Sequence, residues 1–208
     1  MLTFLVHTRT AWGDYFTASN QNNLSSQTYT SRQTLSDTSV HISNCLFRSI
    51  TSTSDGGALY CSSSVTYLLV ESTSFFSCNT SNSYGGAIYF YNTDSGQCVL
   101  YEVCGNDCCS YTGGSSYGQF AYIYVNNGAS SKNCVNYSTT ARCVNENPNS
   151  YYTIRLENGN ICCPSINMSI NKCYSRSILY CYPYKDYNSV TCSFSYSSFA
   201  ENNATGNT

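Results

Sequence analysis

The sequence predicts an all-β protein built as a right-handed parallel β-helix, or solenoid. Three observations support this prediction: a repeated segment of about 30 residues, short runs that alternate between apolar and polar side chains, and the lack of a sustained 3.6-residue apolar period. One unit of this size cannot bury its apolar face, whereas stacked units enclose a continuous core. Chirality favours a right-handed path between parallel strands.

The repeat is clearest between residues 43–60 and 72–89, which align without gaps at an offset of 29 residues with nine identities in eighteen positions. In this alignment Phe47 corresponds to Phe76, and both segments end in Gly-Gly-Ala-x-Tyr. A weaker third copy follows at an offset of 33, where Tyr122 occupies the last position. The residues that carry the repeat, including a partial copy at the end of the chain, are Gly56, Gly57, Ala58, Leu59, Phe76, Asn79, Gly85, Gly86, Ala87, Ile88, Phe199 and Asn202.

Short runs rich in aromatic and β-branched residues lie between polar Ser, Asn and Gly stretches, as expected of strands separated by turns. Alternation assigns their faces: Ile88 and Phe90 share the inward face, while Tyr89 and Tyr91 share the outer face. A Gly-Gly pair before the strand suits a corner that needs positive φ and close approach of neighbouring coils. The expected strands include 65–70, 87–91, 97–103, 120–125, 151–156, 178–184 and 190–196.

The repeat pattern divides the chain at residue 41. Residues 1–40 show no clear repeat, and we expect an N-terminal cap, an extra coil or a poorly ordered lead-in there. Residues 41–208 are expected to supply roughly five or six coils of the parallel β-helix. Because the next Gly-Gly would fall just beyond Thr208, we expect the chain to be a fragment of a longer solenoid.

Composition and charge exclude several classes of protein. The 9 Lys and Arg against 11 Asp and Glu give a net charge of −2, which argues against nucleic-acid binding because phosphate neutralisation needs clustered cations. No stretch reaches the roughly 20 apolar residues of a membrane-spanning helix. Ser, Thr and Asn fill 79 of 208 positions, but 21 Tyr and frequent Val and Ile argue against disorder.

The 14 cysteines are spread along the chain, with only 2 histidines and no C-x-x-C pair, so neither a metal nor another cofactor is expected. We expect most of them to form disulfides in an oxidising compartment, with the connectivity left open. The adjacent residues Cys162 and Cys163 are expected to point to opposite faces of one strand. An extracellular or cell-surface location is also favoured by five Asn-x-Ser/Thr sequons, at Asn23, Asn79, Asn136, Asn167 and Asn203.

Four motifs carry a family resemblance. They are GGAL at 56–59, GGAI at 85–88, and F-x-x-N at 76–79 and 199–202. These motifs resemble the paired GGA[ILV] and F-x-x-N repeats of the polymorphic outer-membrane protein family, which comprises bacterial autotransporter-type adhesins. Large surface-protein families of parasitic protists carry similar repeats, and the Cys-, Ser- and Tyr-rich texture of this chain resembles the latter more. The resemblance covers residues 41–125 well and 190–208 in part, and it implies a surface-exposed β-helix that mediates attachment.

Right-handed β-helices also host pectin lyases and polygalacturonases, so a carbohydrate-active enzyme is the alternative function. Such enzymes need a carboxylate pair at a defined separation, or an acidic cluster that holds calcium. The 11 acidic residues are scattered and form no Asp-x-Asp pair. The chain also lacks a G-x-S-x-G motif, so we predict no catalytic residue.

Tyrosines give the strongest functional signal. Stacked coils would align several of them on one outer face, either as a cross-strand ladder that stabilises the sheet or as an amphipathic contact surface. The abundance of tyrosine favours the ladder. We nevertheless expect a non-catalytic, adhesin-like protein that presents an extended β-helix face to a protein or glycan of a host or neighbouring cell. The candidate stripe consists of Tyr60, Tyr89, Tyr91, Tyr122 and Tyr124.

Overall fold

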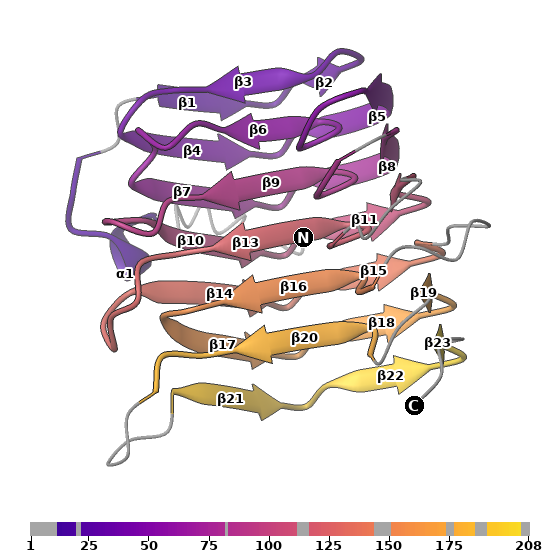
Figure 1. Ribbon diagram of the computed structural model, residues 1–208. Helices are drawn as coiled ribbons and strands as arrows, with labels where there is room; N and C mark the ends of the chain where they lie inside the picture. Colours follow the sequence, from indigo (N-terminus) through magenta and orange to yellow (C-terminus); the bar gives the residue numbers. More distant parts are fainter. Residues whose placement is uncertain are drawn as a thin grey trace, which may run out of the picture.

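The computed structural model describes residues 12–19, 22–81, 83–111, 117–143, 151–173, 177–185 and 191–204. This part of the chain forms a parallel β-solenoid with almost no helix (Figure 1). Strands of the nearest sheet run to the left in Figure 1, strands of the far sheet run to the right, and the chain descends, which makes the coil right-handed. The predicted fold class is confirmed.

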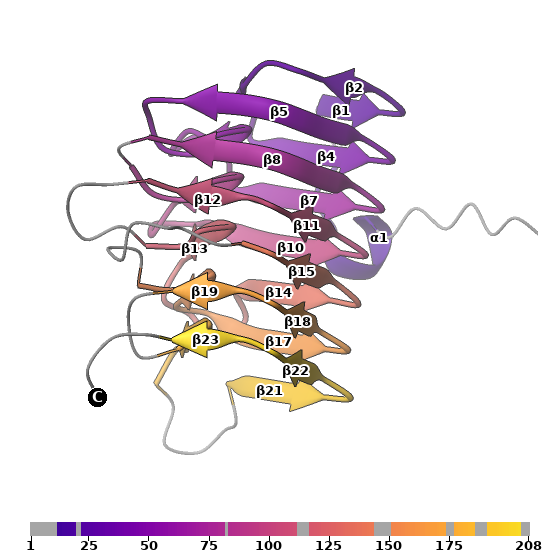
Figure 2. The same cartoon turned by 90° about the vertical axis from the view of Figure 1, so that its right-hand side faces the viewer.

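Three parallel sheets run the length of the stack, and successive coils add strands to each. Sheet A contains β1 (Asn22–Ser25), β4 (Ser39–Ser43), β7 (Tyr67–Glu71), β10 (Gln97–Tyr101), β14 (Lys132–Asn136), β17 (Asn160–Pro164) and β21 (Cys192–Ser195). Sheet B contains β2 (Thr28–Tyr29), β5 (Leu46–Ser52), β8 (Ser74–Thr80), β11 (Cys104–Asn106), β15 (Thr139–Ala141), β18 (Asn167–Ser169) and β22 (Ser198–Ala200), with β12 (Cys109–Ser110) also paired to β8. Sheet C contains β3 (Gln33–Leu35), β6 (Leu59–Cys61), β9 (Ile88–Tyr91), β13 (Ala121–Tyr124), β16 (Ile154–Glu157) and β20 (Leu179–Tyr182). The other elements are the helix α1 (Trp12–Tyr15) and the strand pair β19 (Lys172–Cys173) and β23 (Asn203–Ala204) (Figure 2).

The register of sheet C agrees with the repeat alignment. Leu59 pairs with Ile88, and Tyr60 pairs with Tyr89, which are the offsets of 29 residues that the repeat predicts. Tyr89 in turn pairs with Tyr122, at the predicted offset of 33. Leu59 and Ile88 are fully buried, as the predicted apolar ladder requires.

The two glycines of the repeat have different roles at the corner before sheet C. Gly56 and Gly85 adopt φ of +66° and +65°, a conformation that favours glycine. Gly86 lies against the next coil, where an added Cβ would sit 2.1 Å from the carbonyl oxygen of Gln119. Both expected reasons for the Gly-Gly pair, positive φ and close backbone approach, are therefore present.

The repeat alignment is wrong by one residue in sheet B. Phe47 pairs with Phe75, and Phe76 pairs with Arg48. Phe75 is fully buried and stacks on Phe47 with ring centroids 4.8 Å apart, whereas Phe76 is 41% exposed. The corner before Gly85 holds one residue more than its counterpart in the preceding coil, and an alignment without gaps cannot place that residue.

The two F-x-x-N motifs are consequently not equivalent. Through the strands of sheet B, Phe199 continues the inward row of Phe75 rather than the outer row of Phe76. Both asparagines still bond to a neighbouring coil: the side-chain oxygen of Asn79 accepts from the Cys109 N–H, and that of Asn202 accepts from the Asn171 N–H, each at 3.0 Å.

The solenoid begins earlier than the boundary predicted at residue 41. Strands β1, β2 and β3 form a coil that pairs with β4, β5 and β6. Residues 126–189, which show no repeat motif, also supply strands β14 to β20. Coils therefore stack regularly even where the repeat motif is absent, because stacking depends on backbone pairing and on inward apolar side chains.

At the fourth coil, the aromatic ring that fills the core comes from a different part of the coil. Gly105 occupies the position of Phe75 in the next strand of sheet B. An added Cβ on Gly105 would lie 2.5 Å from the ring of Phe120, which comes from the corner before β13 and fills the space instead. The ring of Phe120 meets that of Phe75 edge to face at 5.8 Å, so the aromatic column continues.

Another feature of sheet B is a row of residues in the left-handed conformation, one residue beyond the outer row of Phe76. Their φ angles lie between +51° and +57° although none of them is glycine. This conformation is uncommon for residues with a Cβ, and most of all for a β-branched residue such as Ile170. The row consists of Ser49, Ser77, Asp107, Arg142, Ile170 and Glu201.

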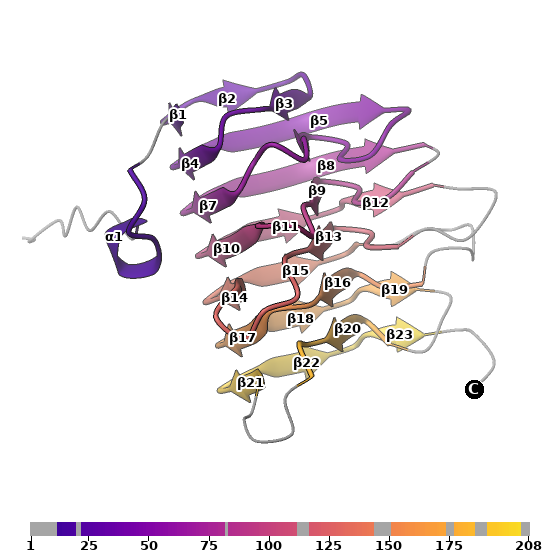
Figure 3. The same cartoon turned by 60° about the vertical axis from the view of Figure 1, so that its left-hand side comes forward.

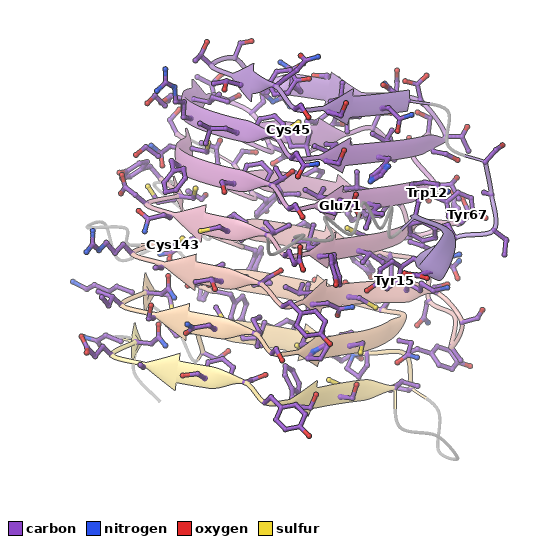
Figure 4. All side chains as sticks on the ribbon, turned by 180° about the vertical axis from the view of Figure 1, so that it is seen from behind. Trp12, Tyr15, Cys45, Tyr67, Glu71 and Cys143 are labelled. Atoms are coloured by element: carbon purple, nitrogen blue, oxygen red, sulfur yellow. The ribbon has the colours of Figure 1, made fainter. Side chains whose placement is uncertain are left out.

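Residues 12–16 cover part of the outer face of sheet A (Figures 3 and 4). Trp12 and Phe16 pack with Leu69, Val99 and Cys134, which lie in register on β7, β10 and β14. The indole N–H of Trp12 donates to the carbonyl oxygen of Ala18 at 2.7 Å, so the ring is buried with its polar atom satisfied.

Candidate functional site: the aromatic face of sheet C

Sheet C presents tyrosines to the outside in two parallel rows. Strand alternation buries Ile88 and Phe90 of β9 and turns Tyr89 and Tyr91 outward. The pairing register continues the outward positions through β6, β13 and β20. We call the resulting surface the aromatic face; it consists of Tyr60, Tyr84, Tyr89, Tyr91, Tyr117, Tyr122, Tyr124, Tyr151, Tyr152, Tyr180 and Tyr182.

The inner row is a stack of nearly parallel rings. Tyr60 and Tyr89 lie 5.7 Å apart with an interplanar angle of 5°, and Tyr89 and Tyr122 lie 5.4 Å apart at 12°. Tyr122 is only 8% exposed. Burial raises the pKa of the Tyr89 and Tyr122 hydroxyls above the usual tyrosine value, so both remain neutral hydrogen-bond donors. This row has the geometry of the predicted stabilising ladder.

The outer row is more accessible. Tyr91 is 41% exposed and meets Tyr124 edge to face at 5.0 Å. Tyr182 lies further along the same row and is 43% exposed. The structure thus brings all five tyrosines of the predicted stripe together, but it divides them between a packed row and an exposed row.

Sequence reasoning missed a third group of tyrosines at the corner before sheet C. Tyr84 and Tyr117 stack at 5.5 Å, and Tyr117 also stacks on Tyr151 at 5.5 Å. Tyr84 and Tyr117 each precede a glycine with positive φ in the repeat, and that recurring Tyr-Gly pair was the available signal.

An ion pair interrupts both rows on β16. Arg155 follows Tyr122 in the inner row, and Glu157 follows Tyr124 in the outer row. The two side chains form a salt bridge. The Arg155 guanidinium lies 3.9 Å from the Tyr117 ring centroid and 5.4 Å from that of Tyr122, as in cation–π contacts. The pair therefore adds polarity without adding net charge to the face.

The carboxylates next to the aromatic face have partners. Glu157 accepts a hydrogen bond from the Tyr122 hydroxyl at 3.5 Å in addition to its salt bridge. Asp55 accepts from the hydroxyl of Ser83 and from the N–H of Tyr84. Within the residues that the structure describes, no group of three or more His, Cys, Asp or Glu side chains could hold a metal ion.

The five sequons differ in accessibility. The Asn136 side chain is 6% exposed and donates to the Tyr15 hydroxyl at 2.7 Å. Asn79 is half-buried in its bond to the next coil. Asn23, Asn167 and Asn203 are exposed, so the folded chain has room for a glycan at these three positions.

All 14 cysteines are free thiols in the structure, and the pairing expected from the sequence stays a prediction. Cys163 is fully buried in the core, whereas its neighbour Cys162 lies on the outer face of sheet A beside Tyr15. The expected opposite orientation of these two adjacent cysteines is confirmed.

In comparisons with known proteins, no family model matches the chain, and no curated protein or solved structure matches it. Among the described residues, no helix has both the length and the apolar character needed to cross a membrane.

Proposed function

We propose that this protein is a non-catalytic, adhesin-like protein, secreted or displayed at the cell surface, whose aromatic face contacts a protein or glycan of a host or neighbouring cell. The observation that carries this proposal is the exposed outer row of the aromatic face. Tyr91 and Tyr182 keep 41% and 43% of their surface exposed on one flank of a regular stack.

Tyrosine suits such a surface for physical reasons. It combines a large apolar ring with a hydroxyl group, and its side chain loses little conformational entropy on binding. The rings of the inner row stack on one another, which holds the outer row in place before a partner arrives. Pre-organisation of this kind lowers the entropic cost of association.

The resemblance of the repeats to those of the polymorphic outer-membrane protein family and of protist surface proteins supports the same proposal. The glycines of the GGA[ILV] motif shape the corner before sheet C, so the motif belongs to the part of each coil that presents the tyrosines. Extracellular location, glycosylation at exposed sequons and disulfide formation are parts of the proposal. Tyr-rich solenoid faces offer an extended surface to a partner.

In this proposal the two rows of tyrosines have different roles. Because Tyr122 is nearly buried between Tyr89 and the Arg155–Glu157 pair, its main role is to support the sheet. Contact with a partner falls to the exposed row, so Tyr91 and Tyr124 are better targets for a binding test than Tyr89 and Tyr122.

A glycan array and a cell-binding screen with the purified protein would identify ligands, followed by the double variant Tyr91→Ser/Tyr124→Ser. We expect at least a roughly tenfold loss of affinity for each ligand, because truncation of a tyrosine at an interface hot spot costs about 2 kcal/mol or more. The matched control is Tyr137→Ser/Tyr196→Ser, which removes two tyrosines that are 55% and 94% exposed away from sheet C.

The control variant should bind as the wild type does, and circular dichroism should show the same β signal in all three proteins. Binding that survives the Tyr91/Tyr124 change would make the aromatic face purely structural. Progressive cleavage of a bound polysaccharide would instead indicate a carbohydrate-active enzyme.

A further inference from the structure

Two cysteines lie directly opposite one another on neighbouring strands of sheet A. Cys134 of β14 and Cys162 of β17 are register partners. Adjacent strands lie about 4.8 Å apart, which falls within the Cα separation that a disulfide spans. Both side chains lie on the outer face of sheet A, where Cys134 belongs to the cluster of Trp12 and Phe16 and Cys162 packs against that cluster.

The surroundings give these two thiols unequal access to solvent. Cys134 is 7% exposed and belongs to the apolar cluster formed with Trp12 and Phe16. Cys162 is only half-buried at the margin of this cluster. A reagent in solution can therefore reach Cys162 first, and Cys134 lies beside it on the neighbouring strand.

The protonation of the pair follows from its hydrogen bonds. Hydrogen bonds from the Cys134 thiol and from Ser193 lower the pKa of Cys162 to about 6, although burial acts in the opposite direction. The same hydrogen bond together with burial raises the pKa of Cys134. Cys162 is therefore the more acidic thiol of the two and the first to form the thiolate, which is the reactive form.

Other titratable groups surround the pair. Tyr15 of α1 lies close to both cysteines, Tyr101 of β10 lies close to Tyr15, and the Lys132 ammonium of β14 lowers the pKa of Cys134. Burial raises the pKa of Tyr15 to about 12, so this hydroxyl is neutral where the thiol titrates. Lys132 is the nearby cation and favours a thiolate at this place.

Two other groups of cysteines are less suited to the same chemistry. Cys78, Cys108 and Cys143 form a fully buried column in the core, out of reach of a dissolved reagent. Cys192, near Cys181, is partly exposed, but burial raises its pKa to about 11. It is almost fully protonated at neutral pH.

We propose that Cys134 and Cys162 form a dithiol site that undergoes thiol–disulfide exchange with a low-molecular-weight disulfide, Cys162 acting as the attacking thiolate and Cys134 as the resolving thiol. In the first step, the Cys162 sulfur attacks one sulfur of the small disulfide, whose S–S bond breaks and releases one thiolate that takes up a proton. In the second step, Cys134 loses its proton and attacks the Cys162 sulfur, which forms the protein disulfide and releases the second small thiol. The two protein thiols are oxidised and the small disulfide is reduced to two thiols.

The product would join two consecutive coils beneath the segment that covers sheet A. The direct test uses the reduced full chain, oxidised glutathione at pH 7, an acid quench, and peptide mapping without reductant. We expect a Cys134–Cys162 disulfide as the first cross-link in the wild type. In Cys134→Ala, the reaction should stop at a glutathione adduct on Cys162, whereas Cys162→Ser should leave Cys134 unmodified.

Alkylation by iodoacetamide against pH gives an independent readout. Cys162 should react with a midpoint near pH 6 and, at that pH, on the order of tenfold faster than the half-buried Cys104, after allowance for the lower nucleophilicity of a low-pKa thiolate. In Cys134→Ala the midpoint should move upward, because the donated hydrogen bond is gone. Cys134→Ser serves for the mapping if the alanine variant does not fold.

Three results would overturn the proposal: a first cross-link between Cys181 and Cys192, a glutathione adduct on Cys134 in Cys162→Ser, or Cys162 alkylation that begins only above about pH 8. The matched control Cys104→Ser should give the same first cross-link and the same Cys162 alkylation midpoint as the wild type. None of these outcomes depends on whether the aromatic face binds a partner.

Discussion

The outer faces of sheets A and C both carry apolar side-chain surface, and they shield it from water in different ways. Sheet A turns Leu69 and Val99 outward and lies under residues 12–16, so both side chains are fully buried. Sheet C turns tyrosines outward and needs no such segment. Figure 4 shows Trp12, Tyr15 and Tyr67 gathered on the covered side of the solenoid.

The difference lies in the chemistry of the side chains. Leucine and valine gain stability only when water is excluded, so a row of them needs another element above it. Tyrosine rings exclude water by stacking on one another and still present their hydroxyl groups to solvent. A solenoid face can therefore be buried or left open for a partner through the choice of residue in a single outward row.

The largest effect should come from breaking the stack that both faces share. In Gly86→Ala, the added Cβ would lie 2.1 Å from the backbone oxygen of Gln119 and 2.4 Å from that of Cys109. We expect a loss of about 3 kcal/mol or more in the free energy of unfolding, measured by urea denaturation with circular dichroism. Gly13→Ala is the control, because nothing lies within 4 Å of its added Cβ. Equal stability of the two variants would contradict the close stacking of coils.

Weakening the segment that covers sheet A should have the next largest effect on stability. Trp12→Ala deletes a ring that is 9% exposed and rests on the apolar row of sheet A. We expect a loss of about 2 kcal/mol and increased binding of a hydrophobic dye, since that row becomes accessible. Tyr91→Ala on sheet C is the comparison and should change stability by less than about 0.5 kcal/mol. A larger loss of stability in Tyr91→Ala than in Trp12→Ala would contradict this difference between sheets A and C.

Alkaline pH should loosen the covered face through Tyr15. Burial raises its pKa from 10.0 to about 12 in the folded chain. The unfolded chain therefore releases this proton first, and the stability that the neutral hydroxyl contributes is present below pH 10 and is lost as pH rises toward 12. Because the group is about half exposed, we expect its share to be only about 1 kcal/mol.

The emission of Trp12, the only tryptophan, reports this region directly. Tyr15→Phe should unfold at a higher pH than the wild type in this assay. An unchanged alkaline midpoint in Tyr15→Phe would remove Tyr15 from the explanation.

The smallest effect concerns the left-handed row in sheet B. Ile170 holds φ at +57° with a β-branched side chain that is 44% exposed. Asparagine tolerates this conformation better, so Ile170→Asn should stabilise the protein by about 0.5 kcal/mol in urea denaturation. The reverse change at the equivalent position, Ser49→Ile, should destabilise it. A loss of stability in Ile170→Asn would show that the isoleucine contributes contacts that outweigh the backbone strain.

The sequence allowed the fold and the tyrosine register to be predicted because local rules settle both. The Gly-Gly corner and the in–out alternation place Tyr60, Tyr89 and Tyr122 in line without knowledge of any tertiary contact. The shift at Phe75 escaped prediction, since corner lengths vary between coils and pairing in sheet B is set by the backbone.

Two further features were not predicted, each for its own reason: the segment that covers sheet A and the Arg155–Glu157 ion pair. Helix α1 has four residues, too few for a periodic signal. The continuous apolar run Leu68-Leu69-Val70, which is typical of a strand buried on both faces, was the signal that could have revealed the cover. Arg155 and Glu157 follow the same alternation as the tyrosines, but the contact of Arg155 with Tyr117 depends on how the corner folds.

Ring-to-ring contacts of Tyr89 in solution would test the coil-by-coil account most directly. With selectively labelled tyrosine and Tyr→Phe variants for assignment, nuclear Overhauser effects should connect the Tyr89 ring to both Tyr60 and Tyr122, whose centroids lie 5.7 Å and 5.4 Å away. A Tyr89 ring that shows contacts with neither tyrosine would contradict the stacked parallel coils and the aromatic face built on them.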